Sequence, residues 1–303
     1  MERPAVAFAE KWAAFARTLG PQSRLRMAPT PSGFLHVGNA VNFTLNWLAA
    51  RLHPQGRLLL RIDDLDAERK RPEYVQNIFD TLHWLGLDWD EGPRSPEDLE
   101  RQWSQRHRLP LYETLLRTLR ERQYLFACAK SRRDLAPFGS HYPEAFRQQP
   151  CSLDDADVAW RIRTPLPHRP EHMPPDFVVR RRDGIPAYQV VSVADDVFFG
   201  ITHVIRGEDL SASTHAQEYL ARCAELPAFE RIVFLHHPLL TDAQGNKLSK
   251  SAGAQALHAQ QARSTVSPAD VFGLVGRWLA LEEPVSTAAA LLSAARQKAW
   301  VRL

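Results

Sequence analysis

The N-terminal part of the chain alternates between short apolar segments and longer helical ones, and this order constrains the fold more than any other feature. Leu25–Ala28 and Arg57–Ile62 have the length and composition of buried strands, whereas about Val37–Leu52 and Glu73–Leu85 have those of helices. Strands that alternate with helices are typical of a parallel sheet with helical crossovers. We therefore predict an α/β fold with a parallel sheet at its core.

Further segments extend this pattern along the chain. A helix is predicted over residues 4–19, and Ser267-Pro268 has the N-cap and N1 chemistry that opens a final helix. The predicted strands of the second half are 158–163, 177–182, Tyr188–Val197, Ile201–Ile205 and Arg231–Leu235. Residues 94–150 change character, because they are rich in arginine and then in proline, which indicates an insertion.

Length and composition indicate a soluble globular protein. The 303 residues are 44% hydrophobic and 24% charged, which is an ordinary balance for such a protein. No apolar run reaches the roughly 18 residues that a membrane helix needs, and charged residues interrupt the N-terminal apolar positions, so we expect no membrane partner and no secretory signal. Three cysteines are too few for a disulfide framework. We predict a cytoplasmic monomer.

The loop between the first strand and its helix has the residues of a nucleotide site. It reads Arg26-Met-Ala-Pro-Thr-Pro-Ser-Gly33 and continues into His36-Val-Gly-Asn39. The carboxyl ends of parallel strands and the amino termini of the following helices are where open sheets bind phosphates. His36 and Asn39 can donate hydrogen bonds to phosphate oxygens, and Gly38 lets a nucleotide approach the backbone.

A second cationic loop lies about 200 residues downstream. It reads Gly245-Asn-Lys247-Leu-Ser-Lys250-Ser251, and two lysines in such a loop can stabilise charge on a phosphorus undergoing substitution and on departing pyrophosphate. Either motif alone has an ordinary structural explanation, as a satisfied histidine or a solvated basic turn. Together they predict an ATP site with His36, Lys247 and Lys250 as catalytic residues.

These two motifs resemble the HIGH and KMSKS signatures of the class I aminoacyl-tRNA synthetases. The finer match is to the glutamyl branch and runs from about residue 24 to 255. It includes 26–33 (RMAPTPSG), 61–66 (RIDDLD), 85–89 (LGLDW), Ala187-Tyr188, Asp195-Asp196 and 204–210 (VIRGEDL). The resemblance implies a Rossmann-type catalytic domain with an inserted acceptor-binding subdomain and a short C-terminal helical segment.

The implied domain boundaries follow from the matched segments. Residues 24–93 and 186–255 would form the catalytic domain, and 94–185 the inserted subdomain. Residues 1–23 would be an N-terminal helical extension, and 256–303 the C-terminal helices.

The family also implies roles for matched residues in binding glutamate and ATP. Arg206 would bind the side-chain carboxylate, and Asp63, one methylene shorter than the family glutamate, would pair with the α-ammonium group. The remaining expected contacts to the amino acid are Arg26, Ala28, Thr30, Tyr188 and, more weakly, Ser192. ATP would contact His36, Gly38, Asn39, Lys247 and Lys250, with Mg²⁺ accompanying it. Taken singly, Arg206 has an alternative interpretation as an ion-pair arginine, Asp63 as the partner of Arg61, and Tyr188 as a core residue.

The short stretch after Ser251 bears on the acceptor. Only 52 residues follow it, whereas a glutamyl-tRNA synthetase has a large anticodon-binding region there. This shortness resembles the glutamyl-Q tRNA(Asp) synthetases, which esterify glutamate to queuosine in the anticodon loop of tRNA(Asp). Residues 101–133 contain nine Arg or Lys and two Glu, so this stretch is either an RNA-stem contact or a solvated helix face.

The family zinc site is not preserved. Its four ligand positions read Phe126, Cys128, Tyr142 and Phe146, and nearby Cys151 offers only one further thiolate. Structural zinc needs about four N, S or O ligands, so we expect no zinc and an aromatic cluster instead.

Two alternatives remain open from the sequence. In one, glutamate or a related amino acid is activated but passed to a non-tRNA acceptor, as the changed zinc positions and Asp63 suggest. In the other, the chain is a non-catalytic synthetase-like sensor, against which the intact His36, Lys247 and Lys250 argue.

Overall fold

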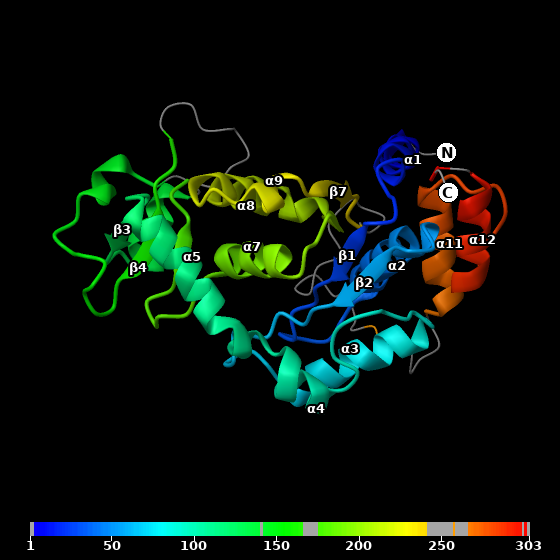
Figure 1. Cartoon of the computed structure of the whole chain (residues 1–303), viewed down its shortest axis with the longest axis horizontal. Helices are drawn as coiled ribbons and strands as arrows, with labels where there is room; N and C mark the ends of the chain where they lie inside the picture. The colour runs from blue at the N-terminus through cyan, green and yellow to red at the C-terminus, as the bar shows by residue number, and fades with distance from the viewer. Residues whose placement is uncertain are drawn as a thin grey trace. The chain divides into compact units, whose positions relative to one another are not determined.

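The computed structural model describes residues 3–139, 142–165, 175–240, 257, 266–298 and 300–301. The chain divides into two compact units (Figure 1). The first unit comprises Met1–His107, Ile201–Asp209 and Ile232–Leu303, and the second comprises Arg108–Gly200 and Leu210–Arg231.

Two pairs of parallel strands form the centre of the first unit. Strand β1 (Arg24–Met27) pairs with β2 (Arg57–Leu60), and β6 (His203–Gly207) pairs with β7 (Val233–His237). The backbone N–H of Thr202, just before β6, donates to the carbonyl of Arg24 at 2.9 Å. This bond joins the starts of β1 and β6, so the two pairs meet edge to edge.

Helices pack around these strands. They are α1 (Arg3–Ala16), α2 (Val37–Leu52), α3 (Pro72–Trp84), α11 (Pro268–Trp278) and α12 (Ala288–Gln297). Three short helical pieces, α4 (Pro96–Asp98), the π-helix Leu99–Trp103 and the 3₁₀-helix Gln105–Arg108, lead out of the unit. The predicted N-cap at Ser267 is confirmed, because its Oγ accepts from the backbone N–H of Asp270 at 3.3 Å. The helix that it opens, α11, is not the final one as predicted, because α12 follows it.

The core of the first unit is rich in aromatic side chains. Trp12 of α1 is fully buried, and its ring lies edge-on to Trp300 at a centroid distance of 6.1 Å. Phe8 meets Trp278 of α11 in the same way at 5.7 Å. Helix α1 is therefore an integral part of this core, because its large apolar side chains fill space between the C-terminal segment and the sheet.

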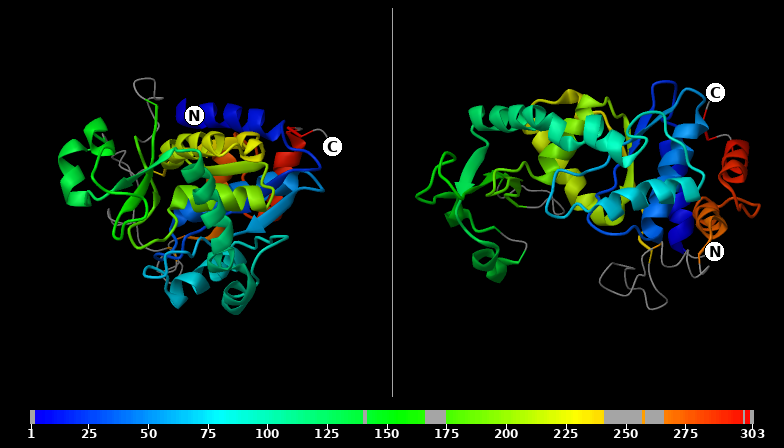
Figure 2. Two further views of the ribbon diagram at one scale, coloured as in Figure 1. Left: turned by 60° about the vertical axis from the view of Figure 1, so that its left-hand side comes forward. Right: turned by 90° about the horizontal axis from the view of Figure 1, so that it is seen from below.

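The second unit contains an antiparallel sheet and a set of helices (Figure 2). Strands β3 (Leu125–Cys128), β4 (Ala159–Ile162) and β5 (Val178–Arg180) pair in that order. The helices are α5 (Leu109–Glu121), α6 (Arg132–Leu135), α7 (Tyr188–Phe198), α8 (Ser211–Cys223) and α9 (Pro227–Glu230). The 3₁₀ turns Ala136–Phe138 and Glu144–Arg147 follow α6, and Glu208–Leu210 precedes α8.

The segment Tyr188–Val197 was predicted to be a strand, and this prediction is wrong. It forms helix α7, in which every residue from Val190 to Asp196 is buried. Burial on nearly all sides removes the 3.6-residue period, and three β-branched valines in a short run favour the strand interpretation. The other predicted helices and strands are confirmed at nearly the same bounds. Within the described part of the chain, no helix is both long and apolar enough to cross a bilayer.

Candidate active site

Pairing between the first two strands continues into the loops that follow them. The backbone N–H groups of Arg61 and Asp63 donate to the carbonyls of Met27 and Pro29, each at 2.9 Å. The loop after β1 and the acidic segment after β2 therefore run side by side at the carboxyl edge of the sheet. Along the first loop Arg26 is 4% exposed, Ala28 is half-buried and Thr30 is exposed.

The first turn of α2 is ordered by its own side chains. Asn39 Oδ1 accepts from the backbone N–H of His36 at 3.0 Å, which satisfies a donor at the helix start. A Cβ added to Gly38 would lie 2.9 Å from Cε1 of His36, so the imidazole occupies the space that the glycine leaves. That Gly38 also lets a nucleotide approach the backbone stays a prediction.

Leu35, directly before this turn, is held from two directions. Its N–H donates to Oδ1 of buried Asn77 on α3 at 2.9 Å. Its carbonyl accepts from the backbone N–H of Leu257 at 2.7 Å, and Leu257 is fully buried. The predicted catalytic residues Lys247 and Lys250 lie outside the described residues, and Leu257 follows Lys250 by seven positions.

The carboxylates of the acidic segment accept several buried hydrogen bonds. Arg61 Nε lies 2.7 Å from Asp63 Oδ1, and the two side chains are 2% and 9% exposed. The carboxylate of Asp64 accepts from Lys70 Nζ at 2.7 Å and from Ser104 Oγ at 2.8 Å. Asp63 therefore pairs with Arg61, which was the alternative interpretation of this residue, and the two charges compensate each other in a buried pair.

Arg206 lies near the carboxyl end of β6 and is 3% exposed. Its guanidinium carbon is 5.0 Å from the ring centroid of Phe234 on β7, a cation–π arrangement that orients the plane of the guanidinium. A buried, planar arginine of this kind suits bidentate recognition of a carboxylate.

Two asparagines of α2 and a histidine of β7 fasten the carboxyl end of β6. The side-chain amides of Asn42 and Asn46 both donate to the carbonyl of Ile205, at 3.2 and 3.1 Å. The second proton of the Asn42 amide is directed to Nε2 of His237 at 3.1 Å, and Nδ1 of His237 lies 2.8 Å from the carbonyl of Pro238. Sequence reasoning missed these residues, although polar side chains four apart on an otherwise apolar helix are a usable signal.

Burial lowers the pKa of His237 below its ordinary value of 6.5, although the Pro238 carbonyl and Asp209 act in the opposite direction. The imidazole is therefore neutral at neutral pH. This state fits the bonds above, with a proton on Nδ1 and an accepting lone pair on Nε2.

The two predicted residues of α7 belong to the second unit. Tyr188 is the first residue of the helix and is 41% exposed, whereas Ser192, one turn later, is fully buried. On the same helix Asp195 forms a buried ion pair with Arg108 of the segment before α5, with Nε 2.7 Å from Oδ1, and accepts from Tyr112 at 2.9 Å. This network fixes α7 within its unit.

The four zinc positions form an aromatic cluster around one thiol. Phe126, Cys128 and Tyr142 are buried together, with Phe146 packed against them. The Tyr142 hydroxyl donates to Cys128 Sγ at 3.2 Å, and burial together with this contact raises the pKa of Tyr142. Burial alone would raise the pKa of Cys128, but the Tyr142 hydroxyl, the backbone of Lys130 and the positive charge of Arg161 together outweigh it and lower that pKa. These four residues offer a single thiolate, which does not fit a four-ligand zinc site.

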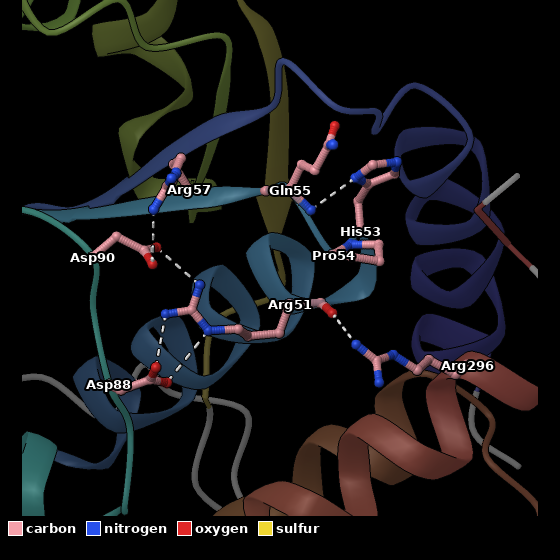
Figure 3. A pocket seen from close by; sticks show the side chains of 9 residues that line it. Arg51, His53, Pro54, Gln55, Arg57, Asp88, Asp90 and Arg296 are labelled. Carbon is pink, nitrogen blue, oxygen red and sulfur yellow. Dashed lines mark hydrogen bonds and ion pairs between the residues drawn. The ribbon is translucent and has the colours of Figure 1, made fainter.

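The described residues also form a charged pocket of about 410 Å³ at the opposite edge of the sheet (Figure 3). Arg57, the first residue of β2, lines it, and so do Arg51 and Arg296. The Arg51 guanidinium lies between Asp88 and Asp90, at 3.0 and 2.9 Å (Figure 3). The pocket contains none of the predicted site residues, and its central arginine is already paired with carboxylates.

A family model for the catalytic domain of class I tRNA synthetases (E and Q) matches residues 22–137 and 148–273. The chain belongs to this family. The protein is accordingly a ligase of the class I synthetase type, and the Rossmann-type fold expected from its motifs is confirmed.

The relatives reported below differ in how much of their own length this chain covers. The chain is 41% identical to the glutamyl-Q tRNA(Asp) synthetase of Parasynechococcus marenigrum (strain WH8102) over 86% of this chain and 84% of the relative. It is 38% identical to that of Prochlorococcus marinus (strain MIT 9303) over 92% and 89%. It is also 38% identical to the glutamate–tRNA ligase of the first organism, over 78% of this chain but only 54% of that protein.

A solved structure agrees with this fold. The glutamate–tRNA synthetase of Elizabethkingia anophelis superposes with a TM-score of 0.63 at 24% identity, over 76% of this chain and 53% of that protein. The chain thus spans about half of the solved synthetase.

Proposed function

We propose that this chain activates glutamate with ATP as glutamyl-adenylate and transfers the glutamyl group to the queuosine nucleoside of tRNA(Asp). The observation that carries the proposal is Arg206, a buried arginine near the carboxyl end of β6 in a parallel sheet whose β1 loop leads into the His36 motif. The names of relatives that match this chain over most of their length support the choice of glutamate and acceptor.

Recognition of the amino acid would rest on opposite charges. Arg206 would bind the side-chain carboxylate through two parallel hydrogen bonds, and Asp63 would face the α-ammonium group. The backbone of the loop at Ala28 and Thr30 and the guanidinium of Arg26 would close the pocket around the main-chain atoms. Tyr188 and Ser192 would contribute contacts from α7.

Activation would be an in-line substitution at the α-phosphorus of ATP. A carboxylate oxygen of glutamate forms a bond to phosphorus while the bond to pyrophosphate breaks, and Mg²⁺ accompanies the nucleotide. His36, Gly38 and Asn39 would hold the nucleotide at the positive end of α2, and Lys247 and Lys250 would stabilise the departing pyrophosphate. The catalysis is chiefly one of position and charge.

Transfer would require RNA to reach the adenylate. A hydroxyl of the acceptor nucleoside attacks the mixed-anhydride carbon and AMP leaves. We propose that residues 94–185 form the acceptor-binding subdomain, that the basic stretch 101–133 contacts the anticodon stem, and that the enzyme acts as a monomer.

The test is ATP–pyrophosphate exchange across the twenty amino acids without RNA, followed by charging of tRNA(Asp) with and without queuosine. Exchange that depends on glutamate, and labelling only of the queuosine-containing RNA, are the expected results. Glutamate-dependent exchange without labelling of either RNA would mean that the acceptor is not tRNA(Asp). No exchange with any amino acid would refute the proposal.

A second candidate keeps the activation and changes the acceptor to a small amine or a carrier protein. The aromatic cluster at Phe126, Tyr142 and Phe146 favours it, because the family places its zinc site in the subdomain where acceptors dock. Glutamate-dependent exchange with neither RNA labelled is the result that selects this candidate.

A further inference from the structure

A buried glutamine sits where the chain leaves the first unit. Gln105 is 1% exposed and opens a 3₁₀ turn, directly after the fully buried Ser104 that ends a π-helical turn. A glutamine buried to this extent needs hydrogen-bond partners, and its partners identify its role.

Gln105 contacts three consecutive residues of the acidic segment. Its side-chain Nε2 donates to Asp63 Oδ1 at 3.1 Å, and its backbone N–H donates to Asp64 Oδ1 at 2.8 Å. Its side-chain Oε1 accepts from the backbone N–H of Leu65 at 3.1 Å. One residue therefore fixes both the backbone and the first carboxylate of this segment.

Arg61, which also pairs with Asp63, cannot do this alone. Arg61 is only two residues away on the same segment, so Arg61 and Asp63 can turn together. Gln105 is 42 residues distant from Asp63 and belongs to another element, so its bond sets the direction of the carboxylate relative to the rest of the unit. A bond to an ionised group is also stronger than one between neutral groups.

We propose that Gln105 is a positioning residue for the amino-acid substrate, because it holds the Asp63 carboxylate in the direction that meets the α-ammonium group. This inference rests on the proposed function. Gln105 touches no reacting atom, so its effect is on the affinity for the amino acid and not on the binding of ATP.

Gln105→Glu is the sharpest test. The substitution keeps an oxygen that accepts from Leu65 N–H and replaces the amide donor to Asp63 by a second oxygen, so two carboxylates oppose each other at about pH 8. We expect the KM for glutamate in pyrophosphate exchange to rise about tenfold or more, while the KM for ATP stays within about twofold. Gln105→Asn, which keeps the donor on a shorter arm, should give an intermediate KM and decides the question if the first variant does not fold.

Ser104→Ala is the matched control. It removes a buried bond of the same segment, to Asp64 at 2.8 Å, and leaves Asp63 untouched. We expect a lower Tm with an unchanged KM for glutamate. Equal effects of both variants on KM, or a joint rise of the KM values for glutamate and ATP, would reduce Gln105 to a structural role and overturn the inference.

Failure of the proposed function is distinguishable from failure of this inference. If the wild-type protein shows no exchange, the Kd for glutamate from calorimetry replaces the KM. A Kd about tenfold weaker in Gln105→Glu supports the positioning role even then. Equal Kd values, or no binding by the wild type, overturn it.

Discussion

At the scale of single residues, the histidine ring of His36 lies where a side chain on residue 38 would otherwise be. The His36 ring fills the volume that a Cβ on residue 38 would occupy. The ring is the far end of a rotatable side chain and is half-buried, so a substitution would displace it without disturbing the core. Activity is therefore more sensitive than stability at this position.

Gly38→Ala is expected to lower kcat/KM for ATP by roughly tenfold or more, because His36 must leave its position beside the helix start, with a stability change of about 1 kcal/mol or less. Pyrophosphate exchange and thermal unfolding measure the two effects. Gly20→Ala, where an added Cβ meets no atom within 4 Å, is the matched control and should change neither. A loss of stability as large as the loss of activity would contradict this explanation.

Arg206→Ala is expected to raise the KM for glutamate by roughly ten- to a hundredfold, because a charge-assisted pair with the side-chain carboxylate is lost. The discrimination between glutamate and other amino acids in pyrophosphate exchange should fall with it. Arg57→Ala, an arginine at the start of β2 whose side chain is 64% exposed, should leave both unchanged. A variant of Arg206 that still prefers glutamate would refute the assignment of specificity.

The candidate site residues could be named from the sequence, whereas the residues that hydrogen-bond around them could not. Arg26, Asp63 and Arg206 belong to contiguous motifs that follow strands, and such motifs can be read directly. The spacing of Asn42 and Asn46 marks them as notable but does not identify their partner, a carbonyl of β6, and Gln105 carries no such signal, because its carboxylate partner lies 42 residues away. Only the folded chain brings those groups together.

At the scale of elements, helix α7 could not be predicted from the period of its apolar residues. A helix buried on nearly every side has no polar stripe, so its valines resemble a strand of a parallel sheet. Val37–Leu52 was predicted correctly although it is also largely buried, because its length exceeds that of ordinary strands.

The junction of α2, β6 and β7 gives a prediction for pH. The folded-state pKa of His237 is below its ordinary value of 6.5, so the unfolded chain binds a proton that the folded one excludes. The contribution of His237 to the free energy of unfolding is fully present above pH 6.5. It is lost as the pH falls from 6.5 towards the pKa of His237 in the folded protein, because the unfolded chain then binds a proton that the folded one does not. The free energy of unfolding of the wild type should therefore decrease between about pH 7.5 and 5.5, before most carboxylates titrate.

The control for this effect is His237→Gln, which keeps an acceptor for Asn42 without a titrating ring. Its stability should depend less on pH over the same range. His203, whose pKa burial also lowers, is present in both proteins, so the difference isolates His237. Equal slopes for the two proteins would show that His237 does not carry the dependence.

At the scale of the whole molecule, the composition of the insertion predicts its behaviour towards metal. The cluster of Phe126, Cys128, Tyr142 and Phe146 packs through apolar and thiol–hydroxyl contacts. We expect less than about one tenth of an equivalent of zinc by elemental analysis of the purified protein, and a Tm that a chelator does not change. Stoichiometric zinc, or unfolding on chelation, would show that other residues supply the ligands.

The hydrogen bond from Leu257 to Leu35 connects distant parts of the sequence at one point. We expect a ligand that engages the first turn of α2 to change the strength of this hydrogen bond, and the amide proton of Leu257 would report the change. The NMR signal of the isotope-labelled Leu257 amide would therefore report whether nucleotide is bound, without any measurement of turnover.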